Sequence, residues 1–223
     1  SQGVDQKLVV APGINDYKDL KGKVLAADAV TTGYAVVAMA ILKKYGLEWK
    51  RDYEVKSFGN TVARADAMSR GEAAGAMMSM SDEDIKKRNF KVLTEAKDHV
   101  KHYARGLGAT RRDWANANED LVVRFNRAMI RATDWVQDTK SKDDVIQLLL
   151  VEAKNNKARA ETMYAAALSP TMGFTPRSRL DLEGIRTVIE LRETAGLMKP
   201  GEFKAEKYVD ERFYKKAIAS LTR

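Results

Sequence analysis

Short apolar runs alternate with helix-like stretches over the first hundred residues of the chain. Strands are expected at residues 7–12, 23–29, 52–58, 73–78 and 91–96. Residues 23–29 are apolar enough to be buried on both faces, whereas residues 52–58 alternate between polar and apolar positions. Between them, helices are expected at residues 32–45, 61–70 and 81–89. The first has apolar positions at helical spacing, the second is stopped by Gly71, and the third begins with a capping serine and acidic residues. Because strands that alternate with helices usually form parallel sheets, we expect an open, mostly parallel α/β sheet with helices on both faces.

The second half of the chain has a helical pattern. Residues 100–112 have the composition of an extended, glycine-containing segment, and residues 169–176 that of a loop. The amphipathic helices are expected at residues 119–139, 143–155, 157–168, 181–197 and 208–219. In the first of them, one stripe collects Val122, Phe125, Met129, Ala132 and Val136. The pattern therefore predicts an α/β lobe followed by a largely helical part.

Composition narrows the class of protein. The 223 residues are 44% hydrophobic and 31% charged, as in a globular protein with a substantial core. No cysteine is present, which excludes disulfides and thiolate metal sites. The net charge of +8 is spread among 31 acidic residues, which favours a solvated surface, with a weak anion-attracting field as the alternative. No nucleic-acid-binding motif is present, and no run approaches the ~18 apolar residues of a membrane helix.

A polar turn joins a strand to a helix at Thr31-Thr32-Gly33-Tyr34. The first N–H groups of a helix lack partners, and the helix dipole adds positive charge there. Such a turn accepts a carboxylate, sulfonate, phosphate or carbonyl oxygen. The threonine hydroxyls add donors, glycine permits close approach, and the tyrosine ring can cover a ligand.

Similar polar turns follow the next two strands. Gly59, Asn60 and Thr61 form a strand-to-helix turn, and Met78 and Ser79 end the strand that follows. In an open α/β sheet these turns meet at the carboxyl ends of the strands, where they would line half of a cleft.

Simpler interpretations stay open for each of these residues. Thr-Thr-Gly is also a plain helix N-cap, and Gly59-Asn60 a plain turn. Met77, Met78 and Met80 are equally consistent with a core position. Arg64 also suits a surface position or an ion pair within the lobe.

Signals of catalysis are weak. His99 and His102 lie three residues apart in extended chain without a convincing third metal ligand. There is no Walker A loop and no nucleophile elbow. We therefore expect no enzyme activity, no metal and no cofactor.

The chain resembles the NMT1/THI5-like branch of ABC-transporter substrate-binding proteins, related to sulfonate, nitrate and thiamine-precursor binding proteins. The resemblance rests on the stretch PGINDYKDLKGKVLAADAVTTGYAVVAMAILKKYGL and on FGNTVARADAMSRGEAAGAMM. The second stretch matches the family's G-x-x-x-x-R-x-x-A-[LM]-x-x-G-E pattern at Gly59, Arg64, Ala67, Met68, Gly71 and Glu72. RRDWANANEDLVVRFNRAMIRATDW and YVDERFYKKA resemble later parts of the family.

The resemblance implies a fold and a division into lobes. It implies a type II periplasmic-binding-protein-like architecture, with one α/β lobe and a largely helical part of the other lobe. Residues 1–14 would be a crossover strand and hinge, 15–99 the α/β ligand-binding lobe 2, 100–112 the hinge return and 113–223 the helical remainder of lobe 1.

The resemblance also implies a function. The chain would be the periplasmic solute-binding component of an ABC importer, with its signal peptide removed, and would pass a small polar or anionic molecule to a permease without catalysis. Compared with the family, the N-terminal part of the first lobe has no counterpart here. The chain would be a fragment, or receive this segment from another molecule, or be a short relative. In a short relative the helices of residues 119–219 would expose apolar stripes that need a partner, so we would expect a homodimer or altered packing. The alternative is a structural or regulatory homo-oligomer that binds no ligand. An enzyme on the same lobe, as in pyrimidine-synthesis relatives, would need a histidine-rich or cofactor-bearing site.

Overall fold

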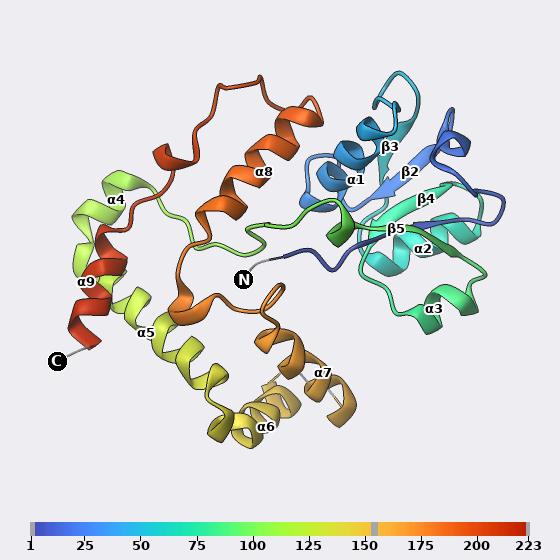
Figure 1. Cartoon of the computed structure of the whole chain (residues 1–223). Coiled ribbons are helices and arrows are strands. Elements are labelled where there is room, and N and C mark those ends of the chain that lie inside the picture. Colours follow the sequence, from blue (N-terminus) through green and yellow to red (C-terminus); the bar gives the residue numbers. More distant parts are fainter. Residues whose placement is uncertain (1–2, 153–155, 222–223) are drawn as a thin grey trace. The chain divides into compact units, whose positions relative to one another are not determined.

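The computed structural model describes residues 3–152 and 156–221, which divide into two compact units (Figure 1). The sheet unit contains residues 4–101 and 186–203. The helical unit contains the described residues among 1–3, 102–185 and 204–223. The chain passes from the sheet unit to the helical unit between residues 101 and 102, inside the segment expected to be a hinge return.

The sheet unit holds a five-stranded sheet. Its strands are β1 (Lys7–Val10), β2 (Val24–Ala27), β3 (Glu54–Ser57), β4 (Gly75–Met78) and β5 (Lys91–Glu95). Their order is β3-β2-β4-β1-β5. β2 pairs in parallel with β3 and β4, and β1 is antiparallel to both β4 and β5. The strands β2 to β5 therefore run in one direction, and the expected open, mostly parallel sheet is confirmed with β1 as its exception.

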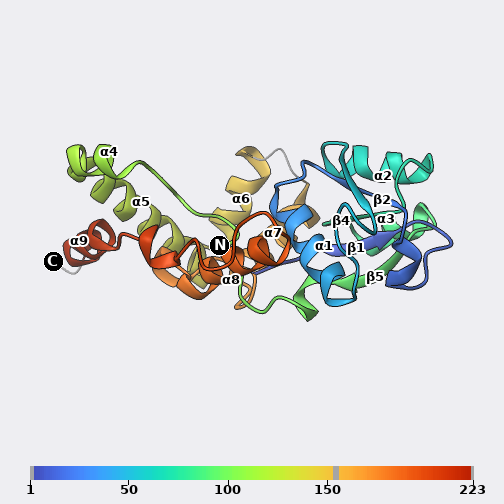
Figure 2. The ribbon, with the colours of Figure 1, turned by 90° about the horizontal axis from the view of Figure 1, so that it is seen from above.

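Helices cover both faces of this sheet, as predicted. They are α1 (Gly33–Lys44), α2 (Thr61–Ser69) and α3 (Asp82–Lys87). Figure 2 shows α1 and α2 on opposite sides of the strands. Every residue of α1 from Ala35 to Leu42 is buried. On the other face, α2 and α3 pack on the sheet in a cluster that includes Ala65, Met68 and Ile85.

Residues 186–203 group with the sheet unit although the sequence pattern placed them in the helical part. They contain the second half of α8 (Leu182–Thr194). The Arg192 guanidinium donates to the carbonyl oxygen of Thr31 at 3.1 Å. Leu191 and Ala195 are each only 8% exposed. This packing depends on contacts between distant segments, which periodicity does not report.

The helical unit is built around α5 (Glu119–Gln137), which contacts α9 (Arg212–Leu221) and the turn Pro176–Ser178. The other helices are α4 (Arg112–Ala117), α6 (Lys142–Glu152) and α7 (Lys157–Leu168). The helix expected over residues 157–168 is confirmed with the expected ends, and those expected over residues 119–139, 181–197 and 208–219 are confirmed with shifted ends. Residues 153–155, where a further helix was expected to end, lie outside the described residues. The short helix α4 was not predicted.

The apolar stripe of α5 is largely solvent-exposed in the helical unit. Phe125 is 58% exposed and Met129 is 44% exposed, whereas Ile130 on a neighbouring face is fully buried. A helix normally turns such a stripe toward a core. Within the described residues, the core of this unit is therefore formed by another face of α5.

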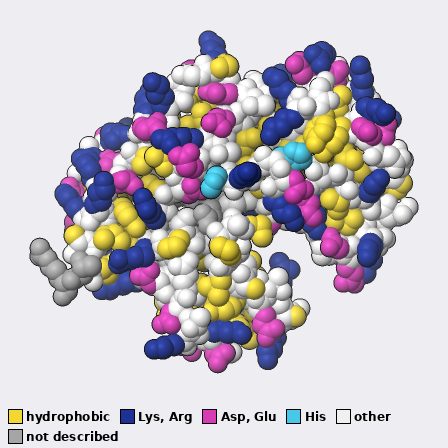
Figure 3. Space-filling model, viewed as in Figure 1, with side chains coloured by type: hydrophobic (Ala, Val, Ile, Leu, Met, Phe, Trp, Pro, Cys, Tyr) yellow, Lys and Arg dark blue, Asp and Glu magenta, His cyan; other side chains and the backbone are white. Residues whose placement is uncertain are grey.

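The surface carries mixed charge. On the face drawn in Figure 3, basic and acidic side chains are interspersed. This agrees with the solvated surface that the sequence favoured. Among the described residues, none of the helices has the length and hydropathy required to cross a membrane.

Asp210 provides a pH-dependent contribution to the helical unit. Hydrogen bonds from Arg212, at 2.7 Å, lower the pKa of Asp210 from 3.8 to about 2, and Arg112 lies at 3.3 Å. Because the folded pKa is depressed, this stabilisation is complete above about pH 4 and is lost as pH falls through 2. We expect Asp210→Asn to lower Tm near pH 7 and to approach the wild-type Tm as the pH falls toward 2. Thermal unfolding between pH 2 and 7 checks this prediction. Glu161→Gln, at an exposed position of α7, is the control. A difference in Tm between Asp210→Asn and wild type that is equal at all pH values would contradict the assignment.

Candidate functional site

The structure brings three of the predicted turns to one edge of the sheet. Ala27 at the end of β2 pairs with Ser57 at the end of β3. The Phe58 N–H donates to the Ala27 carbonyl at 2.8 Å, and the Ser57 hydroxyl to the Asp28 carbonyl at 2.5 Å. Since β4 is also a parallel neighbour of β2, its carboxyl end lies at the same edge.

The first turn caps α1. The Thr32 hydroxyl donates to Asp28 Oδ1 at 2.5 Å, has Ala29 O at 2.9 Å, and accepts weakly from the Ala35 N–H at 3.5 Å. Its single proton is thus used within the chain, so the plain N-cap interpretation describes the Thr32 hydroxyl. The Thr31 side chain is solvent-exposed, while Gly33 and Tyr34 are half-buried.

The second turn caps α2. Gly59 adopts φ of +87°, a conformation that favours glycine. The Asn60 side-chain oxygen accepts from the Ala63 N–H at 3.0 Å, which is an N-cap bond. The Thr61 hydroxyl oxygen accepts from the Arg64 guanidinium at 3.1 Å, so the Thr61 proton is still available to another acceptor.

Four backbone N–H groups stay open at these two helix starts. They belong to Gly33, Tyr34, Thr61 and Val62. No acceptor for them occurs within residues 3–152 and 156–221. Each pair also lies at the positive end of its helix dipole. The arrangement can therefore bind an oxygen atom that carries negative charge.

The third turn contributes less than the sequence suggested. Met78 is fully buried in the core beneath α2, and its side chain offers no surface to a ligand in this conformation. The Ser79 hydroxyl donates to Asp5 Oδ1 at 3.1 Å, so its proton is engaged within the sheet unit. The side chain of Arg64 nevertheless connects the backbone of β4 to the other two turns.

Arg64 also lies at the candidate site, although the sequence pattern did not single it out as a site residue. It was expected at the surface or in an ion pair, but it is only 2% exposed, and no ion pair to it occurs in the described part of the chain. Its guanidinium lies 4.8 Å from the ring centre of Tyr34. The spacing of Arg64 three residues after Thr61, on the same side of a short helix, was the available signal.

The two histidines belong to different compact units, His102 to the helical unit. His99 lies in the sheet unit, where its Nε2 is 2.9 Å from the Thr94 hydroxyl. Burial and the nearby Lys44 ammonium lower the pKa of His99. No cluster of three metal-ligating side chains occurs among the residues that the structure describes.

Comparison with protein families gives one match. The family described as NMT1/THI5 like matches residues 8–141, which is more than half of the chain. No curated protein gives a significant sequence match.

Several solved structures have the same fold. The periplasmic sulfonate-binding protein SsuA of Methylobacillus flagellatus KT is 17% identical, with a TM-score of 0.63 over 97% of this chain and 66% of that one. The periplasmic aliphatic sulphonate binding protein SsuA of Escherichia coli is 16% identical, with a TM-score of 0.59 over 94% of this chain and 67% of that one. The desulfurization enzyme DSZB is 13% identical, with a TM-score of 0.54 over 99% and 78%.

These matches show the fold of periplasmic binding proteins and confirm the expected fold class. The chain spans 66% of the length of the Methylobacillus structure. Most of the named neighbours are binding proteins, but one is an enzyme, so the fold admits both activities.

The Asn60 cap of α2 should make a measurable contribution to stability. Asn60→Ala removes the bond to the Ala63 N–H and should lower the free energy of unfolding by about 0.5–2 kcal/mol. Val62→Ala changes a side chain that is 61% exposed in the same turn and should change it by less than about 0.5 kcal/mol. Urea denaturation measures both, and equal effects would show that the Asn60 side chain does not cap α2.

Proposed function

Because the chain belongs to the NMT1/THI5-like family, we propose that it binds a small polar or anionic organic molecule and passes it to an ABC transporter permease. The family match supports solute binding, and so do the sulfonate-binding proteins among the structural neighbours. Both of these neighbours are periplasmic proteins, which also supports a periplasmic location for this chain.

The observation that carries the proposal is the pair of open helix starts. Gly33 and Tyr34 begin α1, and Thr61 and Val62 begin α2, at neighbouring strand ends. Two sets of unpaired N–H groups favour a solute with several acceptor oxygens, such as a sulfonate or carboxylate. The Tyr34 ring adds an aromatic surface for its apolar part.

The chemistry of this edge favours binding over catalysis. The hydroxyl groups of Thr32 and Ser79 donate to carboxylates of the chain, and neither is paired with a histidine. Among the described residues at the three turns, no nucleophile lies beside a base in the manner of a hydrolytic triad. We therefore propose that the solute leaves chemically unchanged.

The second candidate is a homo-oligomer without ligand binding, and the exposed stripe of α5 favours it. Phe125 and Met129 offer apolar surface that a second copy could bury. Size-exclusion chromatography with light scattering separates the two candidates when combined with a ligand screen. A stable oligomer that no solute stabilises would support the second candidate.

A thermal-shift screen tests the first candidate. The panel contains ethanesulfonate, acetate, sulfate and an uncharged pyrimidine, each at millimolar concentration. We expect at least one oxyanion to raise Tm, since a solute that binds only the folded state stabilises it by mass action. If no member of the panel or a wider solute collection raises Tm, solute binding by this chain is contradicted.

A proline substitution tests which N–H groups bind. Gly33→Pro removes one open N–H at the first position of α1, where proline fits a helix. We expect at least about tenfold weaker binding of the stabilising solute by calorimetry, because a hydrogen bond to a charged group contributes about 1.5–3 kcal/mol. Lys157→Pro, at the first position of α7, is the matched control. Unchanged affinity in Gly33→Pro would remove this turn from the binding site.

A further inference from the structure

Arg64 is the most buried charged side chain of the sheet unit and lies directly behind the candidate site. Its Nη1 group donates to the Met77 carbonyl at 2.7 Å and its Nη2 group to the Thr61 hydroxyl at 3.1 Å. Its Nε group reaches the Asn60 carbonyl at 3.4 Å, the same oxygen that accepts the Arg64 backbone N–H. The ring of Tyr34 completes its surroundings.

These partners belong to three different segments. Met77 is in β4, Asn60 and Thr61 begin α2, and Tyr34 is in the first turn of α1. A guanidinium is planar and presents its donors in a fixed fork, so it fixes the relative positions of the groups it binds. The side chain thereby connects the segments that carry the open N–H groups.

The charge of Arg64 is retained without a bonded carboxylate. Burial lowers the pKa of Arg64, and the nearby Asp28 carboxylate and Tyr34 raise it. An arginine stays protonated at such positions. A buried cation whose hydrogen bonds go to two carbonyls and a hydroxyl is unfavourable compared with an apolar residue of equal volume. Core packing alone does not explain why this position holds an arginine.

We propose that Arg64 is a positioning residue that holds the starts of α1 and α2 in register for solute binding. The hydrogen bonds to Met77 and Thr61 fix α2 against β4, and the contact with the Tyr34 ring extends this order to α1. This role rests on the proposed solute-binding function, but its structural part is testable without any solute.

The test compares backbone amide signals of the ligand-free protein by two-dimensional NMR. Arg64→Met keeps the side-chain volume and removes every donor. We expect shifted signals and at least about tenfold faster hydrogen exchange at Ala63, and also at Ala35, which lies in the first turn of the other helix. Arg64→Lys keeps the charge and one donor group, and it should restore the Ala35 signal in part. Loss of an α2 contact alone would not move Ala35.

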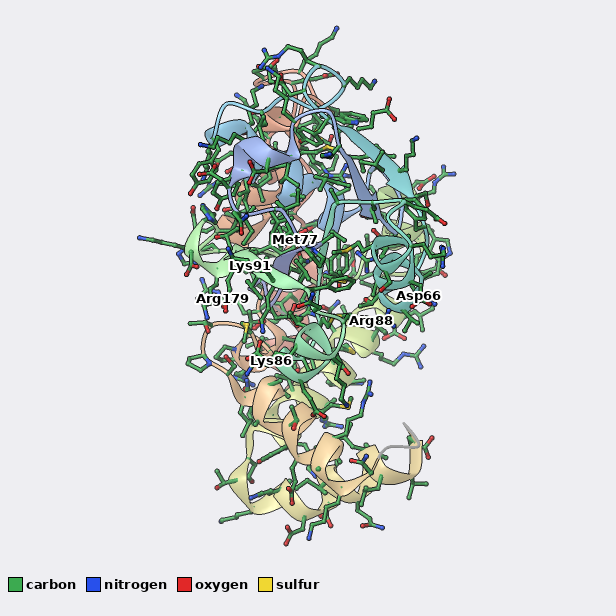
Figure 4. All side chains as sticks on the ribbon, turned by 90° about the vertical axis from the view of Figure 1, so that its right-hand side faces the viewer. Asp66, Met77, Lys86, Arg88, Lys91 and Arg179 are labelled. Atoms are coloured by element: carbon green, nitrogen blue, oxygen red, sulfur yellow. The ribbon has the colours of Figure 1, made fainter. Side chains whose placement is uncertain are left out.

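Arg88→Met is the matched control, because Arg88 contacts the outer side of the same helix. It forms an ion pair with Asp66 at 2.8 Å and donates to Ser69, and Figure 4 shows Arg88 beside Asp66. We expect Arg88→Met to leave Ala35 unchanged. Tyr34→Leu is a second variant, which keeps Arg64 but removes the α1 ring that Arg64 contacts. It should change the hydrogen-exchange rate of the Ala63 amide.

Two results would overturn the proposal: unchanged Ala35 signals in Arg64→Met, or equal changes in Arg88→Met. If Arg64→Met does not fold, an unchanged Ala63 in Tyr34→Leu overturns it instead. The solute screen is independent of these signals. A positive screen with unchanged Ala35 rejects only the role of Arg64, and a negative screen with a changed Ala35 rejects only solute binding.

Discussion

The candidate site depends on one constraint, namely that the first N–H groups of a helix cannot be satisfied within that helix. A parallel sheet with helical crossovers places the starts of successive helices at the same edge. In this chain β2 and β3 are neighbours, so α1 and α2 begin beside each other. Thr32 and Asn60 each cap one N–H group of their helix, and the N–H groups before it stay open. The fold thus brings two sets of open N–H groups to one edge of the sheet.

Holding two helix starts in register requires more than the sheet. The Ser57 hydroxyl joins the ends of β2 and β3, and Arg64 joins α2 to β4. The buried charge of Arg64 opposes folding, but its hydrogen bonds and its contact with Tyr34 offset part of that penalty. A polar network of this kind is stabilising only when all its members are in place. Local order at the site is therefore sensitive to single substitutions.

Much of the sheet unit could be predicted from the sequence, because its strands and helices have different hydrophobic periods. The turns at Thr31–Tyr34 and Gly59–Thr61 were found from their composition, and the structure brings them together. The direction of β1 could not be predicted, since alternation does not encode whether a strand is parallel. The sequence also could not show that the Ser79 hydroxyl donates to Asp5, which is a tertiary contact, or which local acceptor the Thr32 hydroxyl takes. Arg64 was misread for the same reason: an arginine is usually exposed, and only its neighbours reveal its burial.

The helical unit shows a further limit of periodicity. The stripe on α5 marks a face suited to packing, and Phe125 on it is exposed within the described chain, in line with the expectation that these helices expose apolar stripes. Periodicity identifies a face suited to packing, and it does not identify what packs there. The same limit applies to residues 186–203, which the periodic pattern placed with the helices and which the contacts group with the sheet.

The central claim is that the open N–H groups of α1 and α2 bind the solute. An NMR titration of the protein with the solute that most raises Tm tests it most directly. The account predicts that the largest amide shifts fall at Gly33, Tyr34, Thr61 and Val62, with one common binding curve. Saturable binding that leaves these four amides unshifted, with the largest changes elsewhere in the chain, would contradict it.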